Sequence, residues 1–194
     1  MLSLRQRQTF WLLLVNAITA FRLVAAPFML MLAFMGERHA FLYVLVAAFA
    51  SDAADGALAR LTKQDTGFGA LFDTFADAIA YCTIAVSVAI LWPELIHAEM
   101  IAYTILIASF VLPGLLGLMK FRQLTSYHTI LTKIAVVTTA VGLLVLLTGG
   151  PSWPIRLAAS VAALAAVEEV AITLVSDTPR SNINGLFSLW RGRG

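Results

Sequence analysis

Four aspartates stand at fixed spacings in the stretch from residue 52 to residue 77: Asp52, Asp55, Asp73 and Asp77. The first two are three residues apart and the last two are four residues apart, so each pair would share one face of a helix. The flanking residues are strongly apolar, and charged groups at membrane depth are costly and usually mark a functional site. Four like charges cannot face one another there without cations between them. The stretch therefore predicts a site for a hard divalent metal such as Mg²⁺ or Mn²⁺, which favours oxygen ligands.

The spacing of the whole stretch is specific. It reads D-x2-D-G-x2-A-R-x8-G-x3-D-x3-D, and its fixed residues besides the aspartates are Gly56, Ala59, Arg60 and Gly69. This pattern resembles the signature of the CDP-alcohol phosphotransferase (phosphatidyltransferase) family at all eight positions. The resemblance implies that an alcohol displaces CMP from a CDP-linked lipid or alcohol, and that two helices hold a metal pair. The alternative is a set of aspartates in solvated loops, which the apolar segments between them oppose.

The reaction implied by the resemblance assigns roles to the four aspartates. Phosphoryl transfer at a diphosphate needs charge neutralisation and positioning more than covalent help, and a pair of metal ions clamps the attacking and leaving oxygens. We expect Asp52, Asp55 and Asp73 to be metal ligands. Asp77 is the candidate general base, and the resemblance allows it to bind metal as well. Because nearby cations make a carboxylate a weak base, Asp77 would mainly orient the acceptor hydroxyl.

Small and polar residues beside the aspartates form a candidate nucleotide site. Gly56, Ala59 and Gly69 lack bulk, which lets paired helices approach closely; the resemblance implies that the same smallness admits the cytidine nucleotide. Arg60 has donors suited to phosphate oxygens, or alternatively anchors the helix end at the membrane surface. Thr66 is a weaker candidate for the same pocket.

The first apolar segment carries a polar stripe made of Asn16, Thr19 and Arg22, followed by Pro27. Polar groups along one stripe of a spanning helix should face the protein interior. One interpretation is a set of hydrogen bonds between helices together with a proline kink. The resemblance places this stripe beside the nucleotide, which makes Asn16 and Thr19 further nucleotide-binding candidates.

Composition predicts an all-α integral membrane protein with a single domain, residues 1–194. Of the 194 residues, 60% are hydrophobic and 12% are charged, whereas soluble domains have about 45–50% apolar residues. The expected transmembrane helices are residues 10–35, 40–61, 67–92, 100–119, 130–147 and 155–175. His97 and Glu99 follow Pro93 in what we expect to be a solvated loop.

Six spans would put both termini on one side of the membrane. Most basic residues lie near that side, whereas Arg38 and Arg156 lie near the other. The positive-inside rule then places the termini and the aspartates towards the cytoplasm. We expect a multi-pass protein of the cell (inner, cytoplasmic) membrane whose active site faces the cytoplasm. The resemblance also suggests a homodimer, and we expect no nucleic-acid partner.

A second basic group consists of Lys120, Arg122 and Lys133. It is explained either by membrane topology or by a pocket for a phosphorylated acceptor alcohol. Lys133 is the better candidate because it lies within an apolar run. Glu168 or Glu169, in the last expected span, could pair with Lys133 or with Arg22.

The preferred substrates are CDP-diacylglycerol and glycerol 3-phosphate, in phospholipid biosynthesis. Inositol phosphate, serine or another head-group alcohol is an alternative acceptor. A protein of another class, a divalent-ion transporter, could also use the aspartates. It would require polar residues across the whole bilayer, whereas the outer halves of these spans are apolar.

Overall fold

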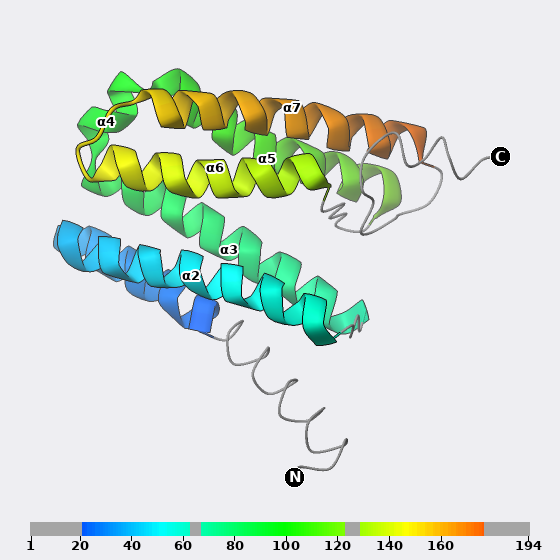
Figure 1. Ribbon diagram of the computed structural model, residues 1–194, viewed down its shortest axis with the longest axis horizontal. Helices are drawn as coiled ribbons and strands as arrows, with labels where there is room; N and C mark the ends of the chain where they lie inside the picture. The colour runs from blue at the N-terminus through cyan, green and yellow to red at the C-terminus, as the bar shows by residue number, and fades with distance from the viewer. Residues whose placement is uncertain (1–20, 63–66, 123–128, 177–194) are drawn as a thin grey trace, which may run out of the picture. The chain divides into compact units, whose positions relative to one another are not determined.

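The computed structural model describes the backbone of residues 21–62, 67–122 and 129–176, and the side chains of these ranges except 52–74. All regular structure in these ranges is helical (Figure 1), which confirms the predicted all-α class. The helices are Phe21–Met35, α2 (Arg38–Thr62), α3 (Gly67–Leu91), α4 (Pro93–Ala98), α5 (Met100–Phe121), α6 (Ile130–Leu147) and α7 (Trp153–Val175). The chain divides into two compact units, Met1–Pro93 and Glu94–Gly194.

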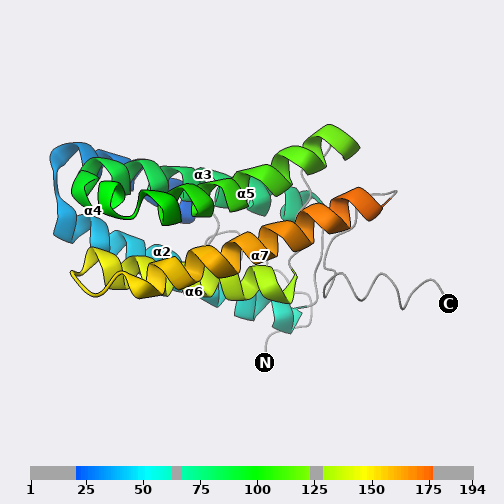
Figure 2. The same cartoon turned by 90° about the horizontal axis from the view of Figure 1, so that it is seen from above.

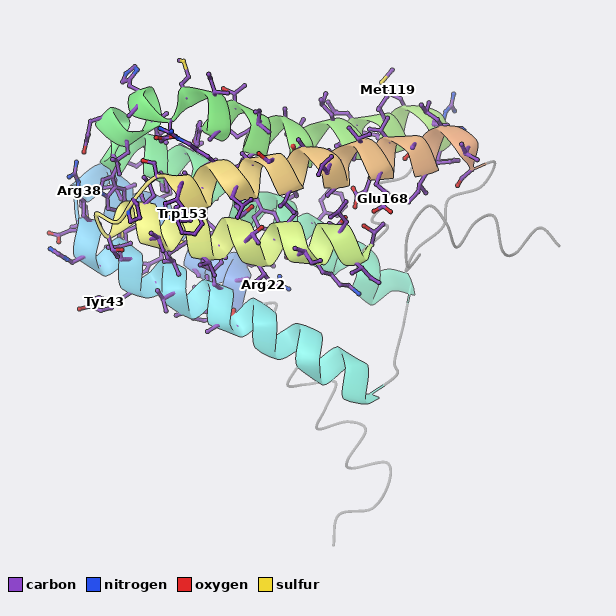
Figure 3. The ribbon with its side chains drawn as sticks, turned by 45° about the horizontal axis from the view of Figure 1, so that its top comes forward. Arg22, Arg38, Tyr43, Met119, Trp153 and Glu168 are labelled. Atoms are coloured by element: carbon purple, nitrogen blue, oxygen red, sulfur yellow. The ribbon has the colours of Figure 1, made fainter. Side chains whose placement is uncertain are left out.

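Three of the described helices, α5, α6 and α7, are long and apolar enough to cross a membrane. Shorter apolar helices run over Phe21–Met35, Arg38–Ser51 and Phe75–Leu91. Large apolar side chains are exposed on several helices, among them Tyr43 and Met119 (Figure 3). Apolar surface of this extent is typical of a membrane-embedded protein rather than a soluble monomer. The protein is therefore an all-α membrane protein, and the count of six spans stays a prediction.

Two helix ends are closed by glycines with positive φ. Gly36 has φ 76° after the helix Phe21–Met35, and Gly149 has φ 84° after α6. At the first end the amide of Gly36 bonds to the carbonyl of Ala33 and that of Glu37 to Leu32. This is the Schellman arrangement, in which a left-handed residue lets the chain satisfy the last carbonyls of a helix. The turn after Gly36 directs the chain into α2.

In the first unit, aromatic packing joins the beginning of α2 to the end of α3. The rings of Phe41 and Trp92 have centroids 5.8 Å apart, and both residues are buried. The Arg38 guanidinium lies 5.3 Å from the centroid of the Trp92 ring, within the range of a cation–π interaction. These contacts fix α2 and α3 together at the end remote from the aspartates.

In the second unit, α7 packs against both α5 and α6 (Figures 1 and 2). The seam between α6 and α7 is built from small side chains, with Ala135, Ala162 and Ala165 forming one buried cluster. Near the other end of α6, a Cβ added at Gly142 would lie 3.0 Å from both the Cα of Ile155 and the carbonyl oxygen of Pro154. Small residues thus let these two helices approach closely.

The prediction that Glu99 is a solvated loop residue is wrong. Residues 93–98 form the short helix α4, and Glu99 is only 7% exposed. Arg156 donates from Nε to Oε2 of Glu99 at 2.8 Å and from Nη2 to Oε1 at 2.7 Å. These hydrogen bonds hold the pKa of the Glu99 carboxyl below its usual value, against the opposing effect of burial. The bidentate pair ties the beginning of α5 to the beginning of α7, while His97 is exposed as expected.

We expect Gly142→Ala to lower the thermal stability of the protein. The added methyl group would meet backbone atoms rather than a flexible side chain, and overpacking of this kind costs about 1–3 kcal/mol. The midpoint of thermal unfolding in detergent should fall by a few degrees. The control is Gly114→Ala in α5, where an added Cβ meets nothing within 4 Å. An equal midpoint for the two variants would contradict the close approach at Gly142.

Candidate functional site

The sequence pattern around the aspartates falls on two helices of the first unit. Asp52 and Asp55 lie in the last three turns of α2, whereas Asp73 and Asp77 lie in the first three turns of α3. Helical backbone through both segments means that the spacings of three and four residues place the members of each pair on one face. The local condition for the predicted ligand pairs is therefore met on both helices.

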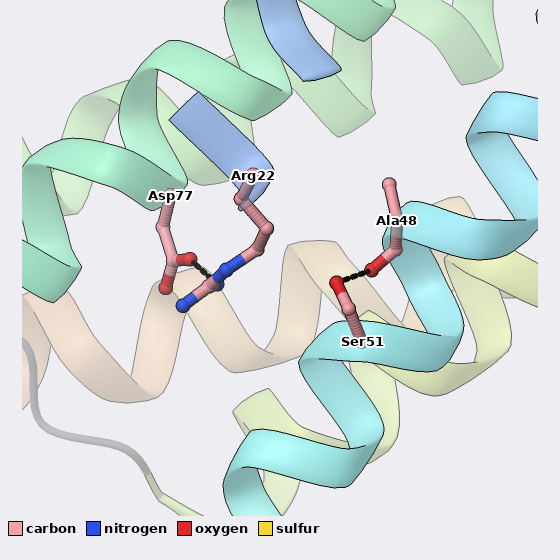
Figure 4. Close-up of polar contacts among 4 residues, drawn as sticks. All are labelled: Arg22, Ala48, Ser51 and Asp77. Carbon is pink, nitrogen blue, oxygen red and sulfur yellow. Dashed lines mark hydrogen bonds and ion pairs between the residues drawn. The ribbon is translucent and has the colours of Figure 1, made fainter. Parts of the chain in front are cut away.

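Asp77 is the one member of the four whose side chain lies within the described residues. The side chain of Asp77 is 24% exposed. Its Oδ1 accepts a hydrogen bond from Nη1 of Arg22, and the two groups form an ion pair (Figure 4). Arg22 stands 55 residues earlier in the sequence, in the helix described over Phe21–Met35, and is only 5% exposed. This confirms that Arg22, within the predicted polar stripe, faces the protein interior.

The ion pair between Arg22 and Asp77 was missed in the sequence analysis. The spacing of the polar stripe indicated that Arg22 faces inward, but the acids predicted as its possible partners were Glu168 and Glu169 rather than Asp77. A buried arginine is strongly unfavourable without a charged partner, so an acid on a facing helix was the signal to look for. The structure supplies that acid as Asp77, which places Arg22 in contact with the candidate site.

Ser51 precedes the first aspartate and uses its hydroxyl within its own helix. Its Oγ donates to the carbonyl oxygen of Ala48 at 2.8 Å (Figure 4). Local bonds of this type are common for serine in helices. The hydroxyl hydrogen of Ser51 is therefore used within α2, directly before the first aspartate.

The donor chemistry of the site fits a divalent cation. Aspartate oxygens are the ligands that Mg²⁺ and Mn²⁺ prefer, and Asp77 follows Asp73 by one helical turn on α3. Outside residues 52–74, the described side chains contain no group of three or more metal-ligating residues. The candidate metal ligands therefore remain Asp52, Asp55, Asp73 and Asp77.

The candidate nucleotide-binding residues lie mostly outside the described side chains. Gly56, Ala59 and Arg60 belong to α2 and Gly69 belongs to α3, so they share helices with the aspartates. Asn16, Thr19 and Thr66 lie outside the described residues. Their contact with a nucleotide stays a prediction.

The candidate acceptor residues gather at one end of the second unit. Lys120 and Arg122 stand at the end of α5, and Lys133 lies in the first turn of α6. The Nζ of Lys120 donates to the carbonyl oxygens of Thr173 and Leu174, each at 2.9 Å. A lysine in this position caps the last carbonyls of α7 and is favoured by the helix dipole. Lys120 thus has a structural role that the sequence did not reveal.

Arg122 and Lys133 are exposed. Next to Lys133, the Oγ1 of Thr132 donates to Oε1 of Glu169 at 2.7 Å. This bond connects the beginning of α6 to the last turns of α7, the same end of the unit at which Lys120 caps α7. Glu169, one of the two predicted partners of Lys133, therefore accepts a hydrogen bond from a threonine. The exposed ammonium of Lys133 suits an anionic ligand.

Comparison with known proteins gives two findings. The family model for CDP-alcohol phosphatidyltransferase matches residues 12–175. Over 99 residues the chain is 39% identical to the CDP-diacylglycerol–glycerol-3-phosphate 3-phosphatidyltransferase of Yersinia enterocolitica. That alignment covers 47% of this chain and 54% of the Yersinia protein, so the chain matches about half the length of this relative. No solved structure gives a significant match.

Proposed function

The chain belongs to the CDP-alcohol phosphatidyltransferase family, and on this premise we propose that it transfers the phosphatidyl group of CDP-diacylglycerol to an alcohol, with release of CMP. The observation that carries the proposal is the eight-residue pattern on two helices of one unit, with its last aspartate held by a buried arginine. The reaction forms a bond from the acceptor oxygen to the phosphorus bearing diacylglycerol. It breaks the bond from that phosphorus to the oxygen of CMP.

The residues of the site divide this work between them. A pair of divalent cations, Mg²⁺ or Mn²⁺, held by Asp52, Asp55, Asp73 and Asp77 would neutralise charge on the diphosphate. Arg60 binds phosphate oxygens of the CDP moiety through its planar donors. Asp77 orients the acceptor hydroxyl and takes its proton as the new bond forms, which is the role of a general base. Gly56, Ala59 and Gly69, with Asn16, Thr19 and Thr66, form the nucleotide pocket.

We propose glycerol 3-phosphate as the acceptor, which makes the activity that of a phosphatidylglycerophosphate synthase. Two observations support this choice. The name of the Yersinia relative gives glycerol 3-phosphate as its acceptor. In this chain, two exposed cationic side chains, Arg122 and Lys133, lie at one end of the second unit. A phosphorylated acceptor carries about −1.5 to −2 charges at neutral pH. Cations beyond the metal pair are needed to bind it beside a diphosphate.

The test is a transfer assay on purified protein in mixed micelles. Labelled CDP-diacylglycerol is offered with glycerol 3-phosphate, inositol phosphate, serine or glycerol in separate reactions. We expect a labelled lipid product and stoichiometric CMP with glycerol 3-phosphate. Transfer to a different alcohol would replace the acceptor and leave the reaction class standing. No transfer to any acceptor, with Mg²⁺ or Mn²⁺ present, would contradict the function.

Lys133→Ala should raise the KM for the acceptor far more than the KM for CDP-diacylglycerol. Losing one charge-assisted hydrogen bond costs about 1.5–3 kcal/mol, roughly a tenfold to hundredfold change. Steady-state kinetics with each substrate varied in turn measure both constants. Lys133→Arg, which keeps the charge, is the matched control and should retain most of the affinity. If Lys133→Ala leaves the acceptor KM unchanged, the lysine reports membrane topology alone.

We also propose that the site faces the cytoplasm of a bacterial cell and that the protein is a homodimer in the inner membrane. The distribution of basic residues supports the orientation through the positive-inside rule. The family resemblance supports the dimer. Crosslinking in native membranes tests assembly, and a yield of monomer only would count against it.

A further inference from the structure

Arg22 has an arrangement that the proposed mechanism does not use. It comes from a helix outside the aspartate pattern, yet its guanidinium is buried and bound to the last aspartate of that pattern. Placing an arginine among apolar helices is costly. The buried arginine is tolerated at this position because the carboxylate of Asp77 compensates its positive charge. The reverse also holds, since Arg22 fixes the direction in which the Asp77 carboxylate points.

We propose that Arg22 is the positioning residue of Asp77: it holds the carboxylate in the orientation needed to engage the acceptor hydroxyl. The inference rests on the proposed function. A guanidinium is planar and rigid, so a bond from Nη1 to Oδ1 restricts rotation of the aspartate side chain. A carboxylate has two oxygens with about four acceptor sites. Binding Arg22 through Oδ1 is therefore compatible with a second partner for the same group.

The positive charge of Arg22 distinguishes the positioning of Asp77 from a role in metal binding. A cation beside a metal-ligating carboxylate repels the metal ion. If Arg22 served metal binding, it would carry the wrong charge for it. Removing Arg22 should therefore leave Mn²⁺ affinity unchanged or tighter, while the reaction slows because Asp77 is no longer held in place.

A matched control exists in the same unit. Arg38 is also an arginine, but it lies over the ring of Trp92, which directly follows the end of α3 opposite to Asp77. Trp92 comes about 15 residues after Asp77, which corresponds to roughly 22 Å at 1.5 Å per helical residue. Figure 3 shows Arg22 and Arg38 well apart along the unit. Arg38→Ala removes the same kind of side chain without touching the site.

The test measures turnover, substrate affinity and Mn²⁺ binding on Arg22→Ala, Arg22→Lys and Arg38→Ala. For Arg22→Ala we expect kcat to fall about tenfold to hundredfold, with the KM values little changed. Arg22→Lys, which keeps the charge but not the planar geometry, should recover part of kcat. Arg38→Ala should keep the kcat of the unmodified protein. The affinity for Mn²⁺, measured by electron paramagnetic resonance, should not fall in the Arg22→Ala variant.

A double-mutant comparison isolates the action through Asp77. If Arg22 acts only by holding this carboxylate, Arg22→Ala should cost little further turnover when Asp77→Asn is already present. Full additivity of the two losses would overturn the proposal. So would a rise in the KM for CDP-diacylglycerol as the main effect, which would make Arg22 a substrate ligand. Joint loss of Mn²⁺ binding and thermal stability in both Arg22→Ala and Arg22→Lys would make it structural and would also overturn the proposal.

Failure of the inference is distinguishable from failure of the proposed function. An unmodified protein that transfers no phosphatidyl group contradicts the function. An active unmodified protein whose Arg22→Ala variant keeps full kcat contradicts only the role of Arg22.

Discussion

Asp77→Asn is expected to reduce turnover by roughly 10²–10⁴-fold, the usual contribution of general acid–base catalysis. Asparagine keeps the size of the side chain and an oxygen that can still accept from Arg22. It removes the negative charge and the ability to take a proton. The loss should therefore lie mainly in kcat, measured as CMP release with both substrates saturating. Thermal unfolding should show that the variant remains folded.

The control for this prediction is Glu37→Gln. Glu37 is an exposed acid in the turn before α2 of the same unit, so the change removes one carboxylate without touching the site. We expect it to keep the kcat of the unmodified protein. Asp77→Asn with nearly full kcat would exclude Asp77 as the base and leave only its place among the metal ligands.

The local part of the site was predictable from the sequence because it depends on periodicity. A spacing of three or four residues has a defined meaning once the segment is helical, and α2 and α3 are helical where the aspartates lie. The inward orientation of Arg22 followed from the same reasoning. The all-α architecture was predictable from the length and hydrophobicity of the apolar segments.

The partners of the charged residues were not predictable, because they depend on how distant helices pack. Arg22 meets Asp77 across 55 residues, and Arg156 meets Glu99 across 57. From the sequence, Glu99 followed a helix-breaking proline and looked solvated. In the structure Glu99 is buried, and Arg156 on α7 supplies the charged partner of its carboxylate. Lys120 likewise fitted the positive-inside rule, and only the structure shows that it caps α7.

Removal of divalent cations should abolish phosphatidyl transfer. Four aspartates on two helices of one unit and a substrate diphosphate bring together charges that repel at close range. Without cations, the diphosphate should neither bind productively nor lose CMP. Protein treated with EDTA and freed of chelator should be inactive, and titration with Mg²⁺ or Mn²⁺ should restore activity. Full turnover in the presence of chelator would contradict the metal site.

A variant locates the effect in the aspartates. Asp52→Asn removes one candidate ligand, so a higher Mn²⁺ concentration should be needed for half-maximal activity, whereas Glu37→Gln should leave that concentration unchanged. Direct Mn²⁺ binding measured on the same proteins separates lost affinity from lost catalysis. The measurement also tests the transporter alternative. A transporter would carry Mn²⁺ into proteoliposomes without CDP-diacylglycerol, whereas an enzyme binds the ion at this site and releases CMP only when both substrates are present.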